Sequence, residues 1–148
     1  MDDLRLLTDL DAAALARAFA LRHAVFVVEQ RVPLDLERDD NDATARHVLV
    51  EDGGGQALGT GRVRLVAPAL AKVERVAVAG AARGLGVGRR VMDALEAEAA
   101  RLGAREVTLA AQESAIPFYV ALGYVAEGER FWDAGIPHRK MRRGLGGG

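Results

Sequence analysis

The sequence of 148 residues contains no cysteine. Disulfide bonds, thiolate nucleophiles and cysteine-based zinc sites are therefore excluded. The three histidines are scattered without the spacing of metal ligands, so the sequence predicts no metal site. The chain also lacks an excess of charge of one sign, because its formal net charge is -1. This balance gives no overall electrostatic reason to expect a nucleic-acid or membrane partner.

Long hydrophobic runs are missing too. No apolar run approaches the roughly 18 residues of a membrane span, and the start Met1-Asp2-Asp3 lacks the cationic residues of a signal peptide. We therefore expect a cytoplasmic protein. Half of the residues are hydrophobic, which is enough for a folded core, and the length fits a single domain over residues 1–143. The glycine-rich end, residues 144–148, is expected to be a flexible tail.

What the sequence does contain is a glycine-rich turn between a β-branched run and an apolar-periodic helix. The run is Val76-Ala77-Val78, the turn is Arg83-Gly84-Leu85-Gly86-Val87-Gly88, and the periodic segment covers residues 89–102. The first N–H groups of a helix have no partner within it, and the helix dipole adds positive potential there. Glycine also lets an anion approach the backbone closely. The pattern predicts a binding site for a phosphate or pyrophosphate group.

Other nucleotide-binding turns fit less well. A Walker A loop ends in Gly-Lys-Ser or Gly-Lys-Thr, whereas Gly88 is followed here by Arg89-Arg90. A Rossmann fingerprint reads G-x-G-x-x-G, and the acid that binds the ribose closes the next strand. Here the glycines read G-x-G-x-G, and Glu106 opens that strand instead. A glycine-rich surface loop that binds nothing stays as an alternative.

Hydrophobic periodicity predicts alternating strands and helices, and hence an α/β fold. Strands are expected at residues 4–7, 47–51, 57–66, 72–78, 106–111, 124–127 and 139–142. Helices are expected from an N-cap at Thr8 to about Val25, over residues 85–102, and from a cap at Ser114 to Leu122. The segment from Pro33 to Asp42 is predicted to be a polar loop with little regular structure.

The glycine-rich turn resembles the acyl-CoA pyrophosphate loop of the GNAT N-acetyltransferase superfamily, whose pattern is R/Q-x-x-G-x-G/A. Residues 112–124 resemble the other signature of that family, N-x-x-A-x-x-x-Y-x-x-x-G-F, with Gln112 in place of Asn and Tyr124 in place of Phe. The order of the predicted elements is also that of the GNAT fold. Residues 21–30 and 135–138 resemble the ElaA-like branch of bacterial GNAT proteins.

This resemblance implies a GNAT-like fold of the α/β (α+β) class, in which helices flank a mixed, mostly antiparallel sheet whose strands splay at the acyl-CoA site. It implies an N-acetyltransferase that moves an acetyl group directly from acetyl-CoA to a primary amine in a ternary complex, without a metal. The residues implied in acyl-CoA binding are Val76, Ala77, Val78, Arg83, Gly84, Leu85, Gly86, Val87, Gly88, Arg89 and Gln112. The backbone of residues 76–78 would pair with the pantetheine arm and supply an oxyanion donor.

Two residues are candidates for proton transfer. Tyr119 occupies the tyrosine position of the second signature, which the family places beside the CoA sulfur, so the resemblance implies a general acid. Glu74 lies two residues before Val76, and the two side chains share a face in a regular strand. GNAT enzymes often place a base carboxylate on this strand, so the resemblance implies that Glu74 is a general base. The neighbouring Lys72 and Arg75 favour the alternative of a salt-bridged glutamate.

The residues expected at the acceptor groove are Phe26, Glu29, Gln30, His47 and His138. The two histidines are also alternative bases, because imidazole titrates near neutrality, or else structural residues. The acidic run of Glu37, Asp39, Asp40 and Asp42 would attract a cationic acceptor, unless it is a solvated loop. The expected partner is a small-molecule or peptide amine. A catalytically silent acyl-CoA-binding module and an acyl-homoserine-lactone synthase stay open as alternatives, and a homodimer is compatible with the sequence.

Overall fold

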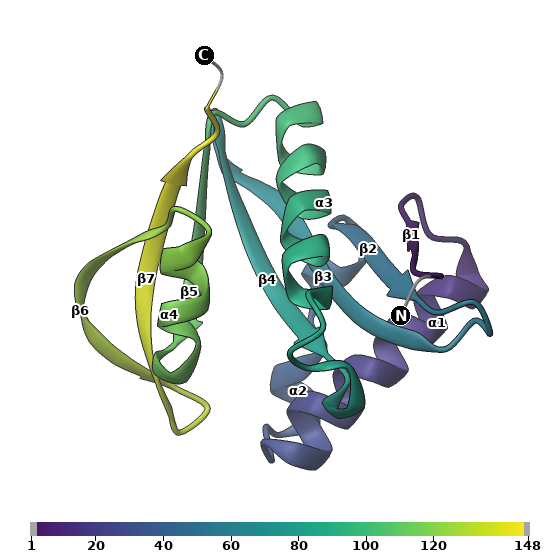
Figure 1. The fold of residues 1–148 in the computed structure, drawn as a ribbon. Helices are drawn as coiled ribbons and strands as arrows, with labels where there is room; N and C mark the ends of the chain where they lie inside the picture. The colour runs from purple at the N-terminus through teal and green to yellow at the C-terminus, as the bar shows by residue number, and fades with distance from the viewer. Residues whose placement is uncertain (1–2, 147–148) are drawn as a thin grey trace.

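The computed structural model describes residues 3–146 and contains a seven-stranded sheet (Figure 1). The strands are β1 (Arg5–Leu7), β2 (Arg46–Glu51), β3 (Ala57–Ala67), β4 (Leu70–Val78), β5 (Glu106–Gln112), β6 (Val125–Asp133) and β7 (Ile136–Gly144). They lie in the order β1-β2-β3-β4-β5-β7-β6, in which β4 and β5 are parallel and the other neighbours antiparallel. This order confirms the predicted mixed, mostly antiparallel sheet.

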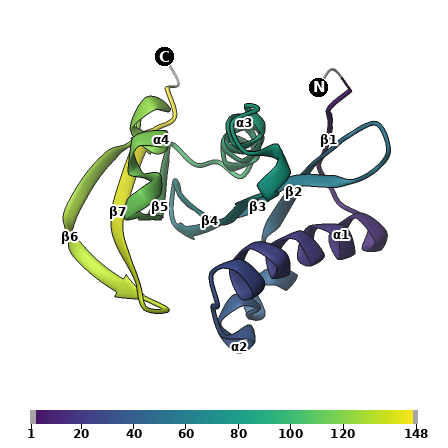
Figure 2. The same cartoon turned by 60° about the horizontal axis from the view of Figure 1, so that its bottom comes forward.

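Helices cover both faces of the sheet. The α-helices are α1 (Ala12–Arg22), α2 (Leu34–Glu37), α3 (Val87–Arg101) and α4 (Ile116–Ala121). A π-helix, η1 (His23–Glu29), continues α1, and the 3-10 turns are η2 (Asp40–Ala43), η3 (Gly80–Ala82) and η4 (Glu113–Ala115). Helices α3 and α4 lie on one face, and α1 and α2 lie on the other (Figures 1 and 2). Within residues 3–146 no helix is long and apolar enough to span a bilayer.

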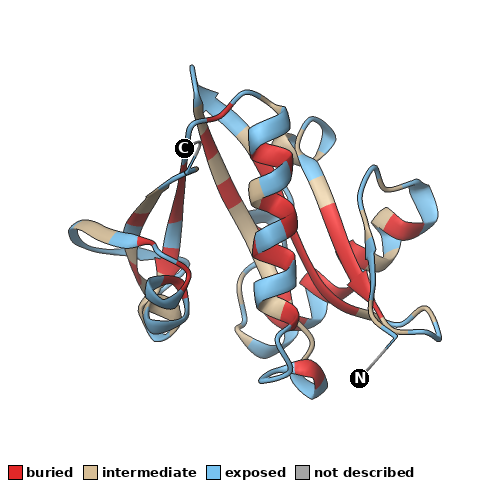
Figure 3. Ribbon diagram, turned by 45° about the horizontal axis from the view of Figure 1, so that its top comes forward, coloured by how far each residue is buried: buried red, intermediate tan, exposed pale blue. Residues whose placement is uncertain are grey.

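The packing of α3 against β3 forms the main core. Val87, Val91 and Leu95 recur at helical spacing and are buried against the sheet. Figure 3 shows this buried side of α3 facing the buried central strands. The helix can approach closely because Gly59 and Gly61 of β3 lie beneath it, and a Cβ on Gly59 would lie 2.6 Å from Val87 Cγ1. The two glycines thus determine where the N-terminus of α3, the expected anion site, is placed.

Two helix starts differ from the predicted caps. Asp11, rather than Thr8, caps α1, because its side chain accepts a hydrogen bond of 2.8 Å from the Ala14 N–H. A carboxylate at this position both accepts the hydrogen bond and complements the helix dipole. Ser114 does not cap α4, because it lies inside η4 and Ala115 takes the N-cap position.

The C-terminal hairpin is longer than predicted. Strand β6 extends to Asp133 and β7 begins at Ile136, and these two residues pair with each other. The turn between them, Ala134-Gly135, has positive φ at both residues, which is the geometry that joins twisted antiparallel strands tightly. The sequence prediction missed the extension because alanine rarely adopts this conformation.

Ordered packing also extends into the predicted flexible tail. Gly144 pairs with Glu106 in the sheet. The N–H of Leu145 donates to the carbonyl oxygen of Arg105 at 2.8 Å, and the side chain of Leu145 packs against the core. Residues 147–148 lie outside the described part of the chain.

The sheet splits between β4 and β5 and takes the shape of a V (Figure 1). The two strands pair only where Leu70–Val73 meets Glu106–Leu109, and beyond these residues they separate. The splayed strands implied by the family resemblance are therefore present. The opening of the V lies at the carboxyl ends of both strands, next to the start of α3.

A bulge in β4 lies at the point where the strands separate. Between the pairs that Glu74 and Ala77 make with β3, two residues, Arg75 and Val76, oppose the single residue Gly61. Arg75 has a φ of 60°, an uncommon conformation for a residue other than glycine. The extra residue changes which side chains of β4 share a face, and so determines which of them are oriented alike near the opening of the V.

Two buried arginines hold α2 and η2 against the sheet. Arg22 hydrogen-bonds Glu37 at 2.7 Å and Asp42 at 2.6 Å. Arg62 hydrogen-bonds Asp39 at 2.8 Å and Asp42 at 2.7 Å. These contacts explain why a segment predicted to be irregular folds into short helical turns. All three carboxylates of the acidic run are thus paired with arginines, and Glu37 and Asp42 are also largely shielded from water, so this group is not free to attract a cationic acceptor.

Candidate active site

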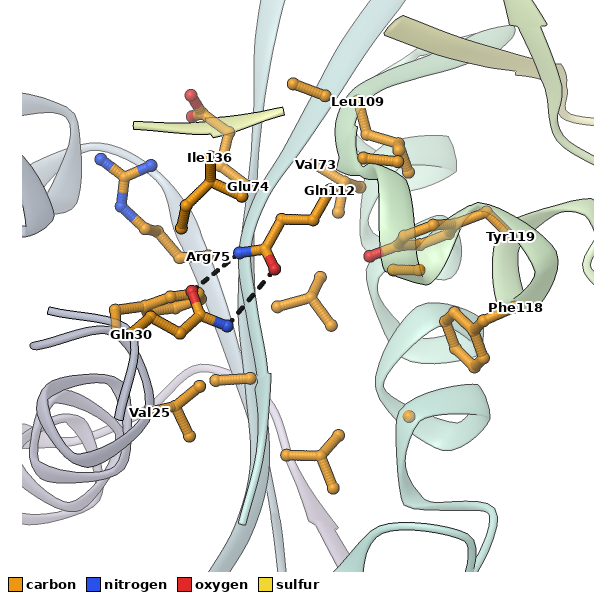
Figure 4. Close-up of a pocket in the computed structure, with 18 of the residues that line it drawn as sticks. Val25, Gln30, Val73, Glu74, Arg75, Leu109, Gln112, Phe118, Tyr119 and Ile136 are labelled. Carbon is orange, nitrogen blue, oxygen red and sulfur yellow. Dashed lines mark hydrogen bonds between the residues drawn. The ribbon is translucent and has the colours of Figure 1, made fainter. Parts of the chain in front are cut away.

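A pocket of about 750 Å³ occupies the V between β4 and β5 (Figure 4). It is lined by η1, α2, β4, the start of α3, β5, α4 and the β6–β7 turn. The predicted site residues that line it are Phe26, Glu29, Gln30, Glu74, Val76, Ala77, Val78, Arg83, Gly84, Gly86, Val87, Gly88, Arg89, Gln112, Tyr119 and His138. Residues that are far apart in the sequence thus meet in one cavity.

The glycine-rich turn leads directly into α3 at one end of the pocket. Gly84 and Gly86 have φ values of 81° and 79°, a region that glycine adopts readily. Open space surrounds the positions that their Cβ atoms would take. Gly86 is also the N-cap of α3 and provides no side-chain cap. The N–H groups of the first turn therefore have neither a helical partner nor a capping side chain, which fits a bound pyrophosphate.

The edge of β4 that faces the pocket offers backbone groups to a ligand. Beyond Val73, no described residue of β5 pairs with β4. The backbone of residues 76–78 therefore lacks a strand partner on this side, and an extended ligand with amide groups could pair there. The side chains of Val76 and Val78 pack against the core beneath α3. Core packing by the side chains is thus compatible with binding by the backbone.

Tyr119 is buried on α4, and its hydroxyl points into the pocket (Figure 4). Its ring packs edge to face against Phe118 and Tyr124, with centroid distances of 4.9 and 5.8 Å. Burial raises the pKa of Tyr119 to about 12, so the phenol stays protonated at neutral pH and can act as a donor. The neighbouring Phe118 also lines the pocket, where a Cβ on Gly88 would lie 3.1 Å from Phe118 Cζ.

The predicted orientation of Glu74 is wrong. Because the bulge adds a residue to β4, side chains two positions apart across it no longer share a face. Val76 packs beneath α3, whereas Glu74 bonds Arg64 at 2.8 Å and Arg62 at 3.2 Å on the opposite face. Burial acts to raise the pKa of Glu74, but pairing with the arginines outweighs it and holds that pKa below its ordinary value. Such a carboxylate is a poor proton acceptor, and the salt-bridged interpretation describes it.

The two candidate histidines have different environments. His47 lies outside the pocket, where its Nε2 is 2.9 Å from the Asp42 carbonyl oxygen and its ring packs edge-on against Phe19. His138 lines the pocket, and its Nδ1 is 2.7 Å from the Ile136 carbonyl oxygen. Since a carbonyl oxygen only accepts, Nδ1 of His138 carries the proton. In the neutral ring, Nε2 then has a lone pair that can accept a proton.

The predicted acceptor and cofactor residues contact each other directly. Gln30, which follows η1, exchanges two hydrogen bonds of 2.8 and 3.3 Å with Gln112 of β5. Glu29 pairs with Arg83 of the glycine-rich turn at 2.9 Å. The end of η1 therefore contacts both halves of the V.

Sequence reasoning missed the role of Arg75. Arg75 forms the bulge, and its guanidinium donates to the carbonyl oxygens of Glu37 and Leu36 at 2.9 and 3.0 Å. A positive φ at arginine has no sequence signal, because glycine, asparagine and aspartate are the residues that favour it. Leu85, predicted to bind acyl-CoA, is half exposed and lies outside the pocket.

Comparisons with known proteins agree with this geometry. A family model described as an acetyltransferase (GNAT) domain matches residues 10–145. YjcF of Bacillus subtilis (strain 168), an uncharacterized N-acetyltransferase, is 42% identical over 130 residues, which are 87% of this chain and 91% of YjcF. The crystal structure of Escherichia coli ElaA is similar with a TM-score of 0.82 and 28% identity, over 97% of this chain and 99% of ElaA. An acyl-CoA N-acyltransferase from Pseudomonas aeruginosa gives a TM-score of 0.81 and 32% identity, over 95% and 98% of the two chains.

The chain therefore belongs to the GNAT acetyltransferase family, and it is an acyltransferase that uses an acyl-CoA co-substrate. The likeness to ElaA confirms the family resemblance found in the two signatures and the ElaA-like resemblance of residues 21–30 and 135–138.

Proposed function

We propose that this protein is an N-acetyltransferase that moves the acetyl group of acetyl-CoA directly to a primary amine, with both substrates bound in the V-shaped pocket. The observation that supports this most is the continuity of the pocket. The start of α3, the unpaired edge of β4 and the Tyr119 hydroxyl all line one cavity of about 750 Å³. Acetyl transfer needs an anion cradle, an extended channel and a proton donor, and this cavity offers all three.

Each part of the pocket suits one part of acetyl-CoA. Gly84, Gly86 and the N–H groups at the start of α3 would hold the pyrophosphate. Arg83 and Arg89 add positive charge at the same end. The backbone of residues 76–78 would pair with the pantetheine amides, and an N–H of this segment would polarise the thioester carbonyl. The amine acceptor, a small molecule or a peptide, would approach from the side of η1.

In the transfer itself, the amine nitrogen bonds to the thioester carbon and the carbon–sulfur bond breaks. The sulfur leaves with the bonding electron pair, and the Tyr119 hydroxyl donates a hydrogen bond to it as negative charge develops. The proton that the amine loses goes to Nε2 of His138, whose Nδ1 is already engaged with the Ile136 carbonyl oxygen. Glu74 is the weaker candidate for this role, because Arg62 and Arg64 occupy its carboxylate.

Replacing Gly86 by aspartate is expected to weaken acetyl-CoA binding at least about tenfold, which is about 1.4 kcal/mol. The substitution places a negative charge where the pyrophosphate would sit. Isothermal calorimetry on the wild type and the variant measures the change. Gly55→Asp is the matched control, because Gly55 has a φ of 81° and open space around its Cβ position but lies outside the pocket. Unchanged affinity in a folded Gly86→Asp variant would contradict the proposed pyrophosphate site.

Replacing His138 by glutamine is expected to lower kcat at least about tenfold near neutral pH, because the amide has no basic nitrogen. The loss should shrink as the pH rises, since more of the amine is then unprotonated. A pH profile of kcat with an accepted amine measures both effects. His23→Ala, an exposed histidine outside the pocket, serves as the control. An equal loss at every pH would mean that His138 positions the substrate and does not accept the proton.

A further inference from the structure

Two consecutive residues, Glu29 at the end of η1 and Gln30 directly after it, contact opposite walls of the pocket. Both carboxylate oxygens of Glu29 accept from Arg83 Nη2, at 2.9 and 3.1 Å. Gln112 Nε2 donates to Gln30 Oε1 at 2.8 Å, and Gln30 Nε2 donates back to Gln112 Oε1 at 3.3 Å. Arg83 belongs to the half of the molecule that carries β4 and α3, whereas Gln112 ends β5 in the other half. Glu29 and Gln30 together, here named the clasp, therefore bridge the open end of the V.

The clasp lies on the side from which the acceptor would approach. Figure 4 shows the paired amides of Gln30 and Gln112 crossing the pocket beside β4, while Tyr119 points into the pocket from the other side. The thioester must lie near the Tyr119 hydroxyl for its sulfur to accept the hydrogen bond. An amine coming from η1 therefore meets the amide pair before it reaches the thioester.

The backbone of the clasp is held in uncommon conformations. A π-helix is rare and is frequently found at functional sites, and here it is the element that ends at Glu29. Arg31, which follows the clasp, has a φ of 59°. Such a conformation costs free energy in a residue other than glycine and persists only where the surroundings hold it. The two polar contacts of the clasp are among the interactions that hold this segment, so their loss favours its movement.

Both contacts are of the kind that a substrate can replace. Arg83 and Glu29 have side chains that are 49% and 42% exposed, and an ion pair so accessible to water contributes little to stability. A phosphate group offers Arg83 a bidentate partner of higher charge. The amides of Gln30 and Gln112 are neutral, and their bonds can be exchanged for bonds to an incoming polar group. Both contacts can therefore be exchanged for contacts with the substrates when these bind.

We infer that Glu29 and Gln30 form a gate on the acceptor side of the pocket, released in part when an acyl-CoA phosphate takes Arg83 from Glu29 and opened when Gln30 parts from Gln112. The inference rests on the proposed function, because it needs acetyl-CoA in the pocket. Closed, the gate keeps water from the thioester until an amine arrives. Glu29 and Gln30 act as positioning residues and do not take part in the bond changes.

The first test of the gate measures hydrolysis of acetyl-CoA without an acceptor, followed as release of free CoA thiol. Gln30→Ala is expected to raise this rate about fivefold, the factor that loss of a hydrogen bond of ordinary strength produces. Its affinity for acetyl-CoA should stay within about twofold of the wild type, because the cradle is intact. Val28→Ala, an exposed position on the same π-helix, is the matched control. Hydrolysis by Gln30→Ala at the wild-type rate would overturn the gate.

A double-mutant cycle separates opening of the gate from general loosening of the pocket. If Gln30 and Gln112 act as one pair, the double alanine variant should hydrolyse acetyl-CoA no faster than Gln30→Ala alone. Rates that multiply would show that the two residues act independently and would overturn the paired gate.

The second test uses the sign of an affinity change. Glu29→Gln removes the carboxylate that competes for Arg83, so acetyl-CoA should bind about threefold more tightly at low salt, with the gain vanishing at high salt. Weaker binding would mean that Glu29 holds Arg83 in a binding-competent position, which overturns the release step.

If wild-type protein bound no acetyl-CoA at all, the proposed function itself would fail. A wild type that binds and transfers normally while the variants match it would leave that function standing and remove the gate alone.

Discussion

Replacing Tyr119 by phenylalanine is expected to lower kcat about a hundredfold or more, the scale on which a general acid contributes. The variant keeps the ring that packs against Phe118 and Tyr124 and loses the hydroxyl that points into the pocket. Acetyl-CoA affinity should barely change, since backbone groups would hold the co-substrate. Because burial raises the pKa of Tyr119 to about 12, the phenol is protonated throughout the neutral range, and the loss should be the same from about pH 6 to 9.

The neighbouring tyrosine provides a matched control. Tyr124→Phe also removes one phenolic hydroxyl, but that hydroxyl donates to Glu96 at 2.7 Å and Tyr124 lies outside the pocket. Tyr124→Phe should therefore affect stability more than turnover. Steady-state kinetics on the two variants show whether the Tyr119 hydroxyl takes part in turnover. If Tyr119→Phe turned over as fast as the wild type, the role of Tyr119 would be packing alone.

Replacing Arg62 by methionine is expected to lower the free energy of unfolding by about 3 kcal/mol. The guanidinium is fully buried and pairs with Asp39, Asp42 and Glu74 at 2.8, 2.7 and 3.2 Å. Its removal leaves these carboxylates without one of their cations, and Asp42 and Glu74 are largely shielded from water. Arg64→Met is the control, because Arg64 is partly exposed and pairs with Glu74 at 2.8 Å, so its loss should cost less than about 1 kcal/mol. Urea unfolding measures both, and equal small losses would show that the buried cluster contributes little.

The same variant should change how stability depends on pH. Burial acts to raise the pKa of Asp42 and Glu74, but their arginine partners outweigh it and hold both below the ordinary values of 3.8 and 4.5. A group whose pKa is depressed by folding contributes stability above its ordinary value, and that contribution is lost as the pH falls through the folded pKa. The difference between wild type and Arg62→Met should thus be complete at pH 7 and shrink below about pH 4. A difference that stays constant into acid would contradict the ionic origin.

Local patterns predicted the parts of the site that depend on local geometry. Gly84 and Gly86 adopt the positive φ values that a glycine-rich turn permits, and the helix that follows leaves its first N–H groups available. Tyr119 reaches the pocket because the second signature places it on the short helix α4, which follows β5 and η4. In each case the determining residues lie within a few positions of one another.

The prediction for Glu74 shows where local rules stop. Alternation along a strand assumes regular pairing, and the bulge at Arg75 interrupts it. The guanidinium of Arg75 is bonded to the carbonyl oxygens of Leu36 and Glu37, which lie 39 and 38 positions away in the chain. No pattern around residue 74 carries that information.

By itself, the sequence determined the order of the strands and of helices α1, α3 and α4, the glycine-rich turn before α3 and the tyrosine of the second signature, because these follow from residues close together in the chain. Only the tertiary structure decided which face Glu74 occupies and which acidic residues are neutralised by buried arginines. It also decided that Glu29 and Gln30 meet Arg83 and Gln112, which are 54 and 82 positions away. Those contacts depend on how the sheet splits and how the helices dock on its two faces, and a linear pattern does not specify either.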